Sequence, residues 1–279
     1  SSTSRGLGDV YKRQIYHMPL AVNADRLGSL DKEDGFLYDV SFVGKLYRDQ
    51  YNFFDQIKGM PEYYKGYFDA LIQTQMKLFG YNVIADVLTP EEFKKISAFI
   101  GFKNDGQMFL DARDMFINIL EKKVTAVERT GLLKALSRYY PVTLFSDVTD
   151  AELQNVAFKG YVNYLTEMPD VFHRSRINLN ITLRSIQSGI PLRCLDIMGT
   201  GGFLMSNYQP ELAKLFENGR EMAMYESKED LLDKVNYYLT HEEERKEIAY
   251  LGREKVRKEY DYKVAVQKIV EIVKTDKLS

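Results

Sequence analysis

The chain has 279 residues, of which 45% are hydrophobic and 28% are charged, proportions typical of a globular protein that can bury a core. Its formal net charge is −2, so no overall field attracts nucleic acid or an anionic membrane, and we expect neither as a partner. The single cysteine, Cys194, excludes an internal disulfide framework, and no apolar run reaches the roughly 20 residues of a membrane span. Together these features predict a soluble, cytoplasmic protein.

The start of the chain lacks the pattern of a folded segment. Residues 1–14, SSTSRGLGDVYKRQ, show no hydrophobic periodicity and resemble translated adapter sequence, so we expect a non-native leader. On that interpretation the native protein begins earlier, and residues 15–279 are its C-terminal portion. Residues 15–23 should be extended, and a polar turn region should follow as far as Gly35.

A β-strand is predicted at Tyr38–Val43, where the sequence YDVSFV alternates and is rich in β-branched and aromatic residues. Gly44 and Lys45 follow it directly. A glycine and a cation just past the carboxyl end of a strand stand where α/β sheets bind phosphate. We therefore include Gly44 and Lys45 in the candidate site.

Helical spacing then dominates residues 51–140. Apolar residues recur at intervals of three and four, as in Phe68, Leu71 and Ile72, and Thr89 followed by Pro90 is typical of a helix start. A helical segment of this length between two strands predicts a helical insertion into an α/β frame.

Strand and helix alternate through the second half of the chain. Predicted strands lie at 141–146, within 156–162, at 177–182 and at 222–225, and predicted helices lie at 168–174, at 210–216, from Ser227 onward, at 241–259 and at 262–274. This alternation predicts an α/β fold with a Rossmann-like parallel sheet covered by helices.

An acid and a glycine cluster stand at the centre of this second half. Asp196 is followed by Gly199, Gly201 and Gly202, and the short apolar runs that flank them are predicted to be buried strands. A carboxylate and bare backbone amides at the end of a strand can hold a sugar hydroxyl and a phosphate. The cluster therefore predicts a ligand site, although glycines in a tight turn are about as common on their own.

Three arginines lie close to this cluster in sequence: Arg176, Arg184 and Arg193. The planar guanidinium group matches a phosphate oxygen pair better than the point charge of lysine does. An ion pair at the surface or between domains is the competing interpretation of Arg193. Residues 176–207 as a whole predict a nucleotide or nucleotide-sugar site.

Several segments resemble the CgeB-like (spore maturation protein) group of bacterial GT-B glycosyltransferases, which is related to glycosyl transferases group 1. The matching segments are PLAVN at 19–23, YDVSFVGKLY at 38–47, INLN at 177–180, PLRCLDIMGTGGFLMSN at 191–207 and AMYESKEDLLDKVNYYL at 223–239. The resemblance implies that residues 15–279 form the C-terminal, nucleotide-sugar-binding half of such an enzyme. It also implies an N-terminal Rossmann-like domain, and hexosyl transfer to a glycan, a protein or a small molecule.

The resemblance further implies roles for individual residues. Asp196 would accept hydrogen bonds from the ribose, the glycine cluster would bring backbone amides to the donor, and Arg193 would stabilise the leaving nucleoside diphosphate. The residues expected to bind the donor are Gly44, Lys45, Asn180, Arg184, Arg193, Asp196, Gly199, Thr200, Gly201 and Gly202. No cofactor is expected. No metal is expected either, because His17, His173 and His241 are scattered and no DxD triplet is present.

Two other classes of function remain open at this point. Many related enzymes carry two glutamates eight positions apart, whereas this chain has Ser188 at the earlier position and Asp196 at the later. A non-catalytic module that binds a nucleotide, or only a partner, is therefore the first alternative. LDIMGTGG also resembles the loop of S-adenosylmethionine-dependent methyltransferases, but here the glycines run into a strand pattern, FLMSN, rather than a helix. A P-loop is excluded, since the Gly-Lys-Ser/Thr ending is missing.

Overall fold

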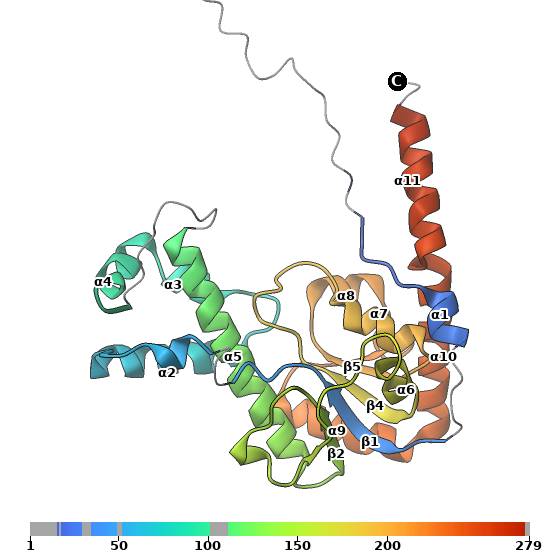
Figure 1. Cartoon of the computed structure of the whole chain (residues 1–279), viewed down its shortest axis with the longest axis horizontal. Helices are drawn as coiled ribbons and strands as arrows, with labels where there is room; N and C mark the ends of the chain where they lie inside the picture. Colours follow the sequence, from blue (N-terminus) through green and yellow to red (C-terminus); the bar gives the residue numbers. More distant parts are fainter. Residues whose placement is uncertain (1–15, 17, 30–34, 49–51, 101–110, 277–279) are drawn as a thin grey trace, which may run out of the picture.

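The computed structural model describes residues 16, 18–29, 35–48, 52–100 and 111–276 of the chain (Figure 1). The expected leader at 1–14, His17 and residues 101–110 of the helical insertion lie outside the described residues. The predictions made for them remain predictions.

The described strands form one parallel sheet of six strands. They are β1 (Tyr38–Val43), β2 (Val142–Phe145), β3 (Ala157–Phe158), β4 (Ser175–Asn180), β5 (Leu204–Asn207) and β6 (Ala223–Tyr225). Their order across the sheet is β3-β2-β1-β4-β5-β6, and each neighbouring pair is parallel. This is the doubly wound, Rossmann-like order, so the predicted α/β fold is confirmed.

Helices cover both faces of the sheet. They are α1 (Ala24–Ser29), α2 (Glu62–Lys77), α3 (Val83–Val87), α4 (Pro90–Ile100), α5 (Ala112–Leu136), α6 (Met168–His173), α7 (Leu192–Gly199), α8 (Pro210–Leu215), α9 (Lys228–Thr240), α10 (Glu242–Glu259) and α11 (Tyr262–Asp276), with 3-10 turns at Phe54–Gln56 and Ala151–Leu153. Helices α5 and α9 contribute to the core on one face, α6, α7 and α8 to the core on the other, and α10 to both. Among the described residues, no helix is both long and apolar enough to cross a bilayer.

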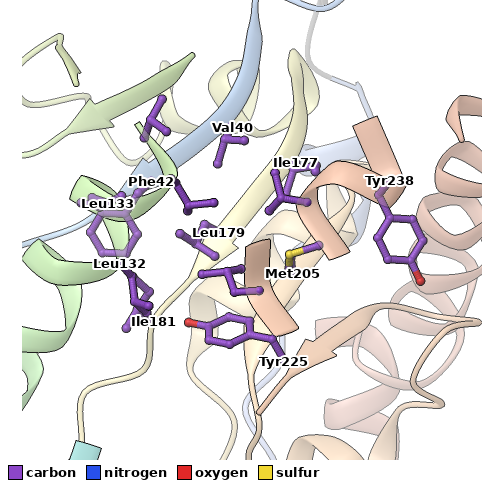
Figure 2. Close-up of a cluster of buried hydrophobic side chains, with 14 of the residues drawn as sticks. Val40, Phe42, Leu132, Leu133, Ile177, Leu179, Ile181, Met205, Tyr225 and Tyr238 are labelled. Atoms are coloured by element: carbon purple, nitrogen blue, oxygen red, sulfur yellow. The ribbon is translucent and has the colours of Figure 1, made fainter. Parts of the chain in front are cut away.

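Figure 2 shows the core between the sheet and helices α5 and α9. Phe42 of β1 and Leu179 of β4 are at most 1% exposed and belong to the same cluster as Leu133 of α5. Because a parallel strand is buried on both faces, its sequence forms a nearly continuous apolar run. Strands β2 and β6 follow this pattern, whereas β1 and β4 alternate apolar with polar residues and bury Ser41, Asn178 and Asn180.

The helical insertion between β1 and β2 is not separate from the sheet. Helices α2 to α4 and the first half of α5 share a hydrophobic cluster that includes Phe68, Ile84 and Phe116. The second half of α5, with Leu132 and Leu136, packs on the sheet instead. In Figure 1 the insertion lies to the left of the sheet, and α5 runs from one part into the other. The predicted insertion is thus present and is joined to the sheet by one helix of 25 residues.

Two local predictions are wrong. The segment that carries Asp196 is helix α7 and not the end of a strand. Its apolar residues Cys194, Leu195, Ile197 and Met198 follow helical spacing, and they are buried against other helices. Residues 24–29 form α1 rather than a turn, since Asn23 Oδ1 accepts the Arg26 N–H at 2.9 Å and Asp261 Oδ2 accepts the Ala24 N–H at 2.9 Å.

The predicted helix starts are confirmed at two places. Ser227 Oγ accepts the Asp230 N–H at 3.0 Å before α9, and Thr89 Oγ1 accepts the Glu92 N–H at 3.2 Å before α4. The last two predicted helices are α10 and α11. Helix α11 projects from the rest of the chain (Figure 1) and leaves Val266 and Val273 about half exposed, at 57% and 47%.

Candidate functional site

The sheet order defines where a ligand site is expected. Strands β1 and β4 are neighbours, but the chain leaves β1 toward the face covered by α5 and leaves β4 toward the face covered by α7. In open α/β sheets, ligands bind outside the carboxyl ends of the strands at such a switch point. Gly44 and Lys45 follow β1 at this edge, and Asn180 ends β4.

Gly44 lies against the guanidinium group of Arg193. Its φ is 152°, and a Cβ at this position would stand 2.8 Å from Nη2 of Arg193. The Gly44 N–H donates to the carbonyl oxygen of Phe145 at 2.9 Å, which ties the turn to the end of β2. Glycine is favoured here because residues with a side chain rarely adopt this φ, and the Arg193 side chain lies where a Cβ would stand. The structure thus brings together two of the predicted site residues that are almost 150 positions apart in sequence.

Arg129 of α5 lies at the same edge, and the sequence analysis did not find it. Its Nε donates to the carbonyl oxygen of Ile181 at 3.0 Å and its Nη1 donates to that of Lys45, so it bridges the ends of β4 and β1. The rings of Phe42 and Tyr47 each lie 5.2 Å from its guanidinium carbon. Arg129 is only 3% exposed. Arg129 precedes Leu132 and Leu133 by three and four residues, so it lies in the apolar stripe of α5. A charged residue in an apolar stripe is the sequence feature from which a buried functional arginine could have been predicted.

The two arginines create a positive region at the switch point. Burial, and next the positive charge of Arg193, lower the pKa of Arg129 to about 9. Burial likewise lowers the pKa of Arg193. Within the described part of the chain, neither guanidinium forms an ion pair with a carboxylate, and the adjacent Glu128 is paired with Arg184 instead. Arg129 is buried and Arg193 is half-buried, and the nearby carboxylates of Glu128 and Asp196 offset their charge only in part, so an anion bound beside them would be stabilised.

Lys45 and Asp196 lie at the border of this region. Lys45 Nζ is 3.8 Å from Asp147 Oδ2, and its side chain is half exposed. Asp196 follows Arg193 by one turn of α7, and its Oδ1 accepts the Tyr164 hydroxyl at 3.2 Å. Burial raises the pKa of the Asp196 carboxyl to about 6, although Tyr164, Arg26 and Arg193 oppose this rise. At neutral pH most of this carboxylate is ionised and can accept hydrogen bonds.

Asn180 is completely buried behind the switch point. Its Nδ2 donates to Thr182 Oγ1 and to Ser206 Oγ, both at 2.9 Å. Thr182 in turn donates its N–H to Asn207 Oδ1 at 2.8 Å, which joins the ends of β4 and β5. The structure therefore gives Asn180 a supporting position beneath the site.

Arg184 is committed elsewhere. Its Nε and Nη2 donate to the two carboxylate oxygens of Glu128 at 2.8 and 2.7 Å, and its Nη1 donates to the carbonyl oxygen of Leu78 at 2.8 Å. The ring of Phe79 lies 4.3 Å from its guanidinium carbon. This arginine joins the loop after β4 to the insertion, so we do not retain it as a donor-binding residue.

The glycine cluster lies at the other edge of the sheet. Gly199 ends α7, and Gly201 and Gly202 lead into β5, so these residues stand at the amino end of a strand. A Cβ on Gly202 would be 2.7 Å from the Phe172 carbonyl oxygen, and one on Gly199 would be 2.7 Å from Leu27. Thr200 is buried, and its hydroxyl donates to the Ile197 carbonyl oxygen at 2.7 Å. Close packing and the end of a helix explain this cluster, and we do not retain it in the candidate site.

No set of side chains for a metal is apparent in what the structure describes. Among those residues, no group of three or more histidines, cysteines, aspartates or glutamates is placed to hold an ion. Cys194 is a free thiol buried in the core, where burial raises its pKa to about 12. It packs as a small apolar residue.

The fold and the arrangement of side chains define a doubly wound α/β domain with a cationic switch point. Residues 129–271 match the model of a family described as glycosyl transferase-like, and the chain belongs to that family. The matched region contains Arg129, Arg193 and Asp196. No curated protein matches the chain in sequence.

Several solved structures show a partial likeness in fold. HepE from Anabaena, solved in complex with UDP and glucose, is 15% identical with a TM-score of 0.44, and the match covers 52% of this chain and 44% of HepE. Sucrose-phosphate synthase from Thermosynechococcus elongatus is 13% identical with a TM-score of 0.44, over 55% and 44% of the two chains. The C-terminal domain of LpcC from Francisella tularensis, a glycosyl transferase group 1 family protein, is 16% identical with a TM-score of 0.40, over 49% and 80%. The match thus spans less than half of HepE and of the synthase.

Proposed function

We propose that this chain binds a nucleotide-sugar donor and serves in glycosyl transfer. The observation that carries the proposal is the pair of arginines at the switch point, the buried Arg129 and the half-buried Arg193, neither of which forms an ion pair with a carboxylate in the described residues. A nucleoside diphosphate supplies the missing negative charge in the form that guanidinium groups bind best. Membership of the glycosyl transferase-like family supports the same ligand class.

Each residue of the site has a role in this proposal. The bond between the anomeric carbon and the diphosphate oxygen breaks and the nucleoside diphosphate leaves with the electron pair. The acceptor oxygen bonds to the anomeric carbon, and its proton passes to the leaving diphosphate. Arg193, with Lys45 at the border, stabilises the charge that grows on the leaving diphosphate. Arg129 holds the ends of β1 and β4 in place and adds to the field. Asp196 accepts a ribose hydroxyl in place of the Tyr164 hydroxyl that it now accepts.

The finer assignment is also part of the proposal. The segments at 38–47, 177–180 and 191–207 support membership of the CgeB-like group, a bacterial source and a cytoplasmic location. They also support hexosyl transfer within a GT-B enzyme, in which an N-terminal Rossmann-like domain completes the cleft. The acceptor class is left open as a glycan, a protein or a small molecule.

The test is calorimetric titration of the chain with UDP, GDP and ADP. We expect at least one of these nucleotides to bind. Asp196→Asn removes a charge-assisted hydrogen bond of about 1.5 to 3 kcal/mol, so affinity should fall about 10- to 150-fold. Arg193→Gln should weaken binding at least as much, whereas Arg257→Gln, on the exposed side of α10, should leave it unchanged.

Contrary outcomes separate the alternatives. If none of the three nucleotides binds the folded wild-type chain, it is an interaction module and not a donor-binding domain. Binding of S-adenosylmethionine in the same assay would assign the site to a methyltransferase. Unchanged nucleotide affinity in both the Arg193 and the Asp196 variants would move the nucleotide away from the switch point.

A further inference from the structure

A pocket of about 320 Å³ opens beside the switch point, on the side of the helical insertion. One wall consists of Gln75 of α2 and residues 80–86 of the insertion, and the other of the loops that follow β4 and β5, at 182–189 and 207–211. It adjoins the cationic cluster formed by Arg129, Arg193 and Lys45. Thr182 lines the pocket, and the preceding residue, Ile181, accepts the Arg129 hydrogen bond. A pocket at the small end of the usual range suits a single ring better than a whole nucleotide sugar.

The two walls are joined by buried polar contacts. Glu121 of α5 is 3% exposed, and one of its oxygens accepts both Asn82 Nδ2 at 2.5 Å and Gln187 Nε2 at 3.3 Å. Gln75 binds three backbone groups of residues 78–83, including the Val83 N–H at 2.9 Å. The amide side chains that line the pocket are therefore held in fixed orientations before any ligand arrives.

One unsatisfied hydrogen-bond acceptor lies in the lining of this pocket. Gln209 lines the pocket, is 7% exposed, and its Oε1 has no partner among the described residues. Buried polar atoms are nearly always paired, so an unpaired acceptor in a pocket points to a ligand that donates hydrogen bonds.

The charges around the pocket exclude a phosphate as that ligand. Asp86 and Glu211 line it, and its one lining cation in the described residues, Arg184, is already neutralised by Glu128. Carboxylate and amide oxygens accept hydrogen bonds from hydroxyl groups, and the rings of Tyr81 and Tyr208 offer apolar faces. An uncharged sugar ring matches this lining, because its hydroxyl groups donate hydrogen bonds and its C–H faces pack on aromatic rings. The cationic cluster and this pocket therefore differ in the ligand that each can hold.

We propose that this pocket binds a sugar ring of the acceptor and that the helical insertion supplies its recognition wall. The inference rests on the proposed glycosyl transfer, since a sugar beside the donor diphosphate can receive the transferred group. It assigns a role to the insertion, which contributes Gln75, Asn82 and Asp86. Acceptor and donor then meet across the Arg129–Ile181 contact, which places the two reactants side by side.

The test uses saturation-transfer NMR and titration with a panel of methyl hexosides, with and without UDP. We expect at least one methyl hexoside to bind the wild-type chain at millimolar concentration. Gln209→Met and Gln187→Ala should each weaken that binding about tenfold or more, because a hydrogen bond to the ring is lost. Gln187 is exposed, so its variant should fold even if the Gln209 variant does not. Gln154 is exposed and does not line the pocket, so Gln154→Met is the matched control.

The outcomes separate the pocket from the nucleotide site. UDP affinity should be unchanged in the Gln209 and Gln187 variants, and hexoside binding should survive Arg193→Gln. If none of UDP, GDP and ADP binds the wild-type chain while hexoside binding is intact, the donor site is refuted and the pocket assignment stands. Failure of every hexoside to bind overturns the pocket assignment. If the Gln187 variant lowers affinity for a UDP-hexose but not for any methyl hexoside, the pocket holds the donor sugar, and our assignment to the acceptor is wrong.

Discussion

The carboxyl group of Glu121 offers a quantitative test of the polar contacts between the insertion and the sheet. Burial raises its pKa from 4.5 to about 7, although hydrogen bonds from Gln187 and Asn82 oppose the rise. The difference between about 7 and 4.5, at about 1.4 kcal/mol for each pH unit, corresponds to about 3 kcal/mol. Glu121→Gln keeps an oxygen that can accept both amide hydrogen bonds and removes the titration.

The sign follows from the direction of the change. Because the pKa of Glu121 is higher in the folded chain than in the unfolded chain, its contribution to stability is fully present below pH 4.5 and is lost as the pH rises through 7. Between pH 4.5 and pH 8 the wild-type chain should therefore lose about 3 kcal/mol of unfolding free energy relative to Glu121→Gln.

Urea unfolding followed by circular dichroism at several pH values measures this difference. The carboxyl group of Asp196, whose pKa burial raises to about 6, titrates in both proteins and cancels in the comparison. Glu247→Gln, at an exposed position on α10, is the matched control and should follow the wild-type curve. A difference between wild type and Glu121→Gln that does not vary with pH would show that Glu121 is not buried as described.

Two further predictions concern the glycines and metal. Gly202→Ala places a methyl group 2.7 Å from a backbone carbonyl oxygen, so the chain should lose about 1 to 3 kcal/mol of stability in thermal melts. Gly131 has open space around it at an exposed helical position, so Gly131→Ala should gain up to about 1 kcal/mol. Equal melting temperatures for the two variants would contradict the packing described at the amino edge of the sheet. Nucleotide affinity should not change when EDTA is added, because a pair of arginines and a lysine take the place of a divalent ion; a large loss of affinity in the same titration would disprove this.

The features that depend on neighbouring residues could be predicted from the sequence. Alternating or apolar runs rich in β-branched and aromatic residues predicted the strands. The Ser227 and Thr89 side chains predicted helix starts, since a cap bonds to an amide only three residues away. The position of Gly44 and Lys45 at the carboxyl edge of the sheet could be predicted in the same way, because the turn after a strand of a parallel sheet lies at that edge.

What the sequence did not show depends on topology and on contacts between distant segments. Arg193 and the glycines after Asp196 are close in sequence, but helix α7 begins near the carboxyl edge of the sheet and ends near the amino edge, with Asp196 in its middle. The sequence also does not show whether an arginine forms an ion pair. Arg184 and Arg193 look alike in sequence, yet Glu128, 56 positions before Arg184, pairs with Arg184 and not with Arg193. Arg129 could have been noticed as a charge within an apolar stripe, but its bridge to β1 and β4 could not.

Helix α5 has a consequence for how this protein can be divided. Along 25 residues it contributes Phe116 to the core of the insertion, Glu121 to the hydrogen bonds that join the two pocket walls, Arg129 to the switch point and Leu136 to the core of the sheet. An insertion is usually regarded as a module that can be cut out and replaced by a short loop. Helix α5 offers no position for such a cut. A cut before α5 leaves its first half without the apolar partners of α2 to α4, and a cut within α5 removes Arg129 or the apolar residues that pack on the sheet. The insertion and the sheet are one unit of folding, and a shortened version of this protein has to keep the whole helix together with α2 and α3.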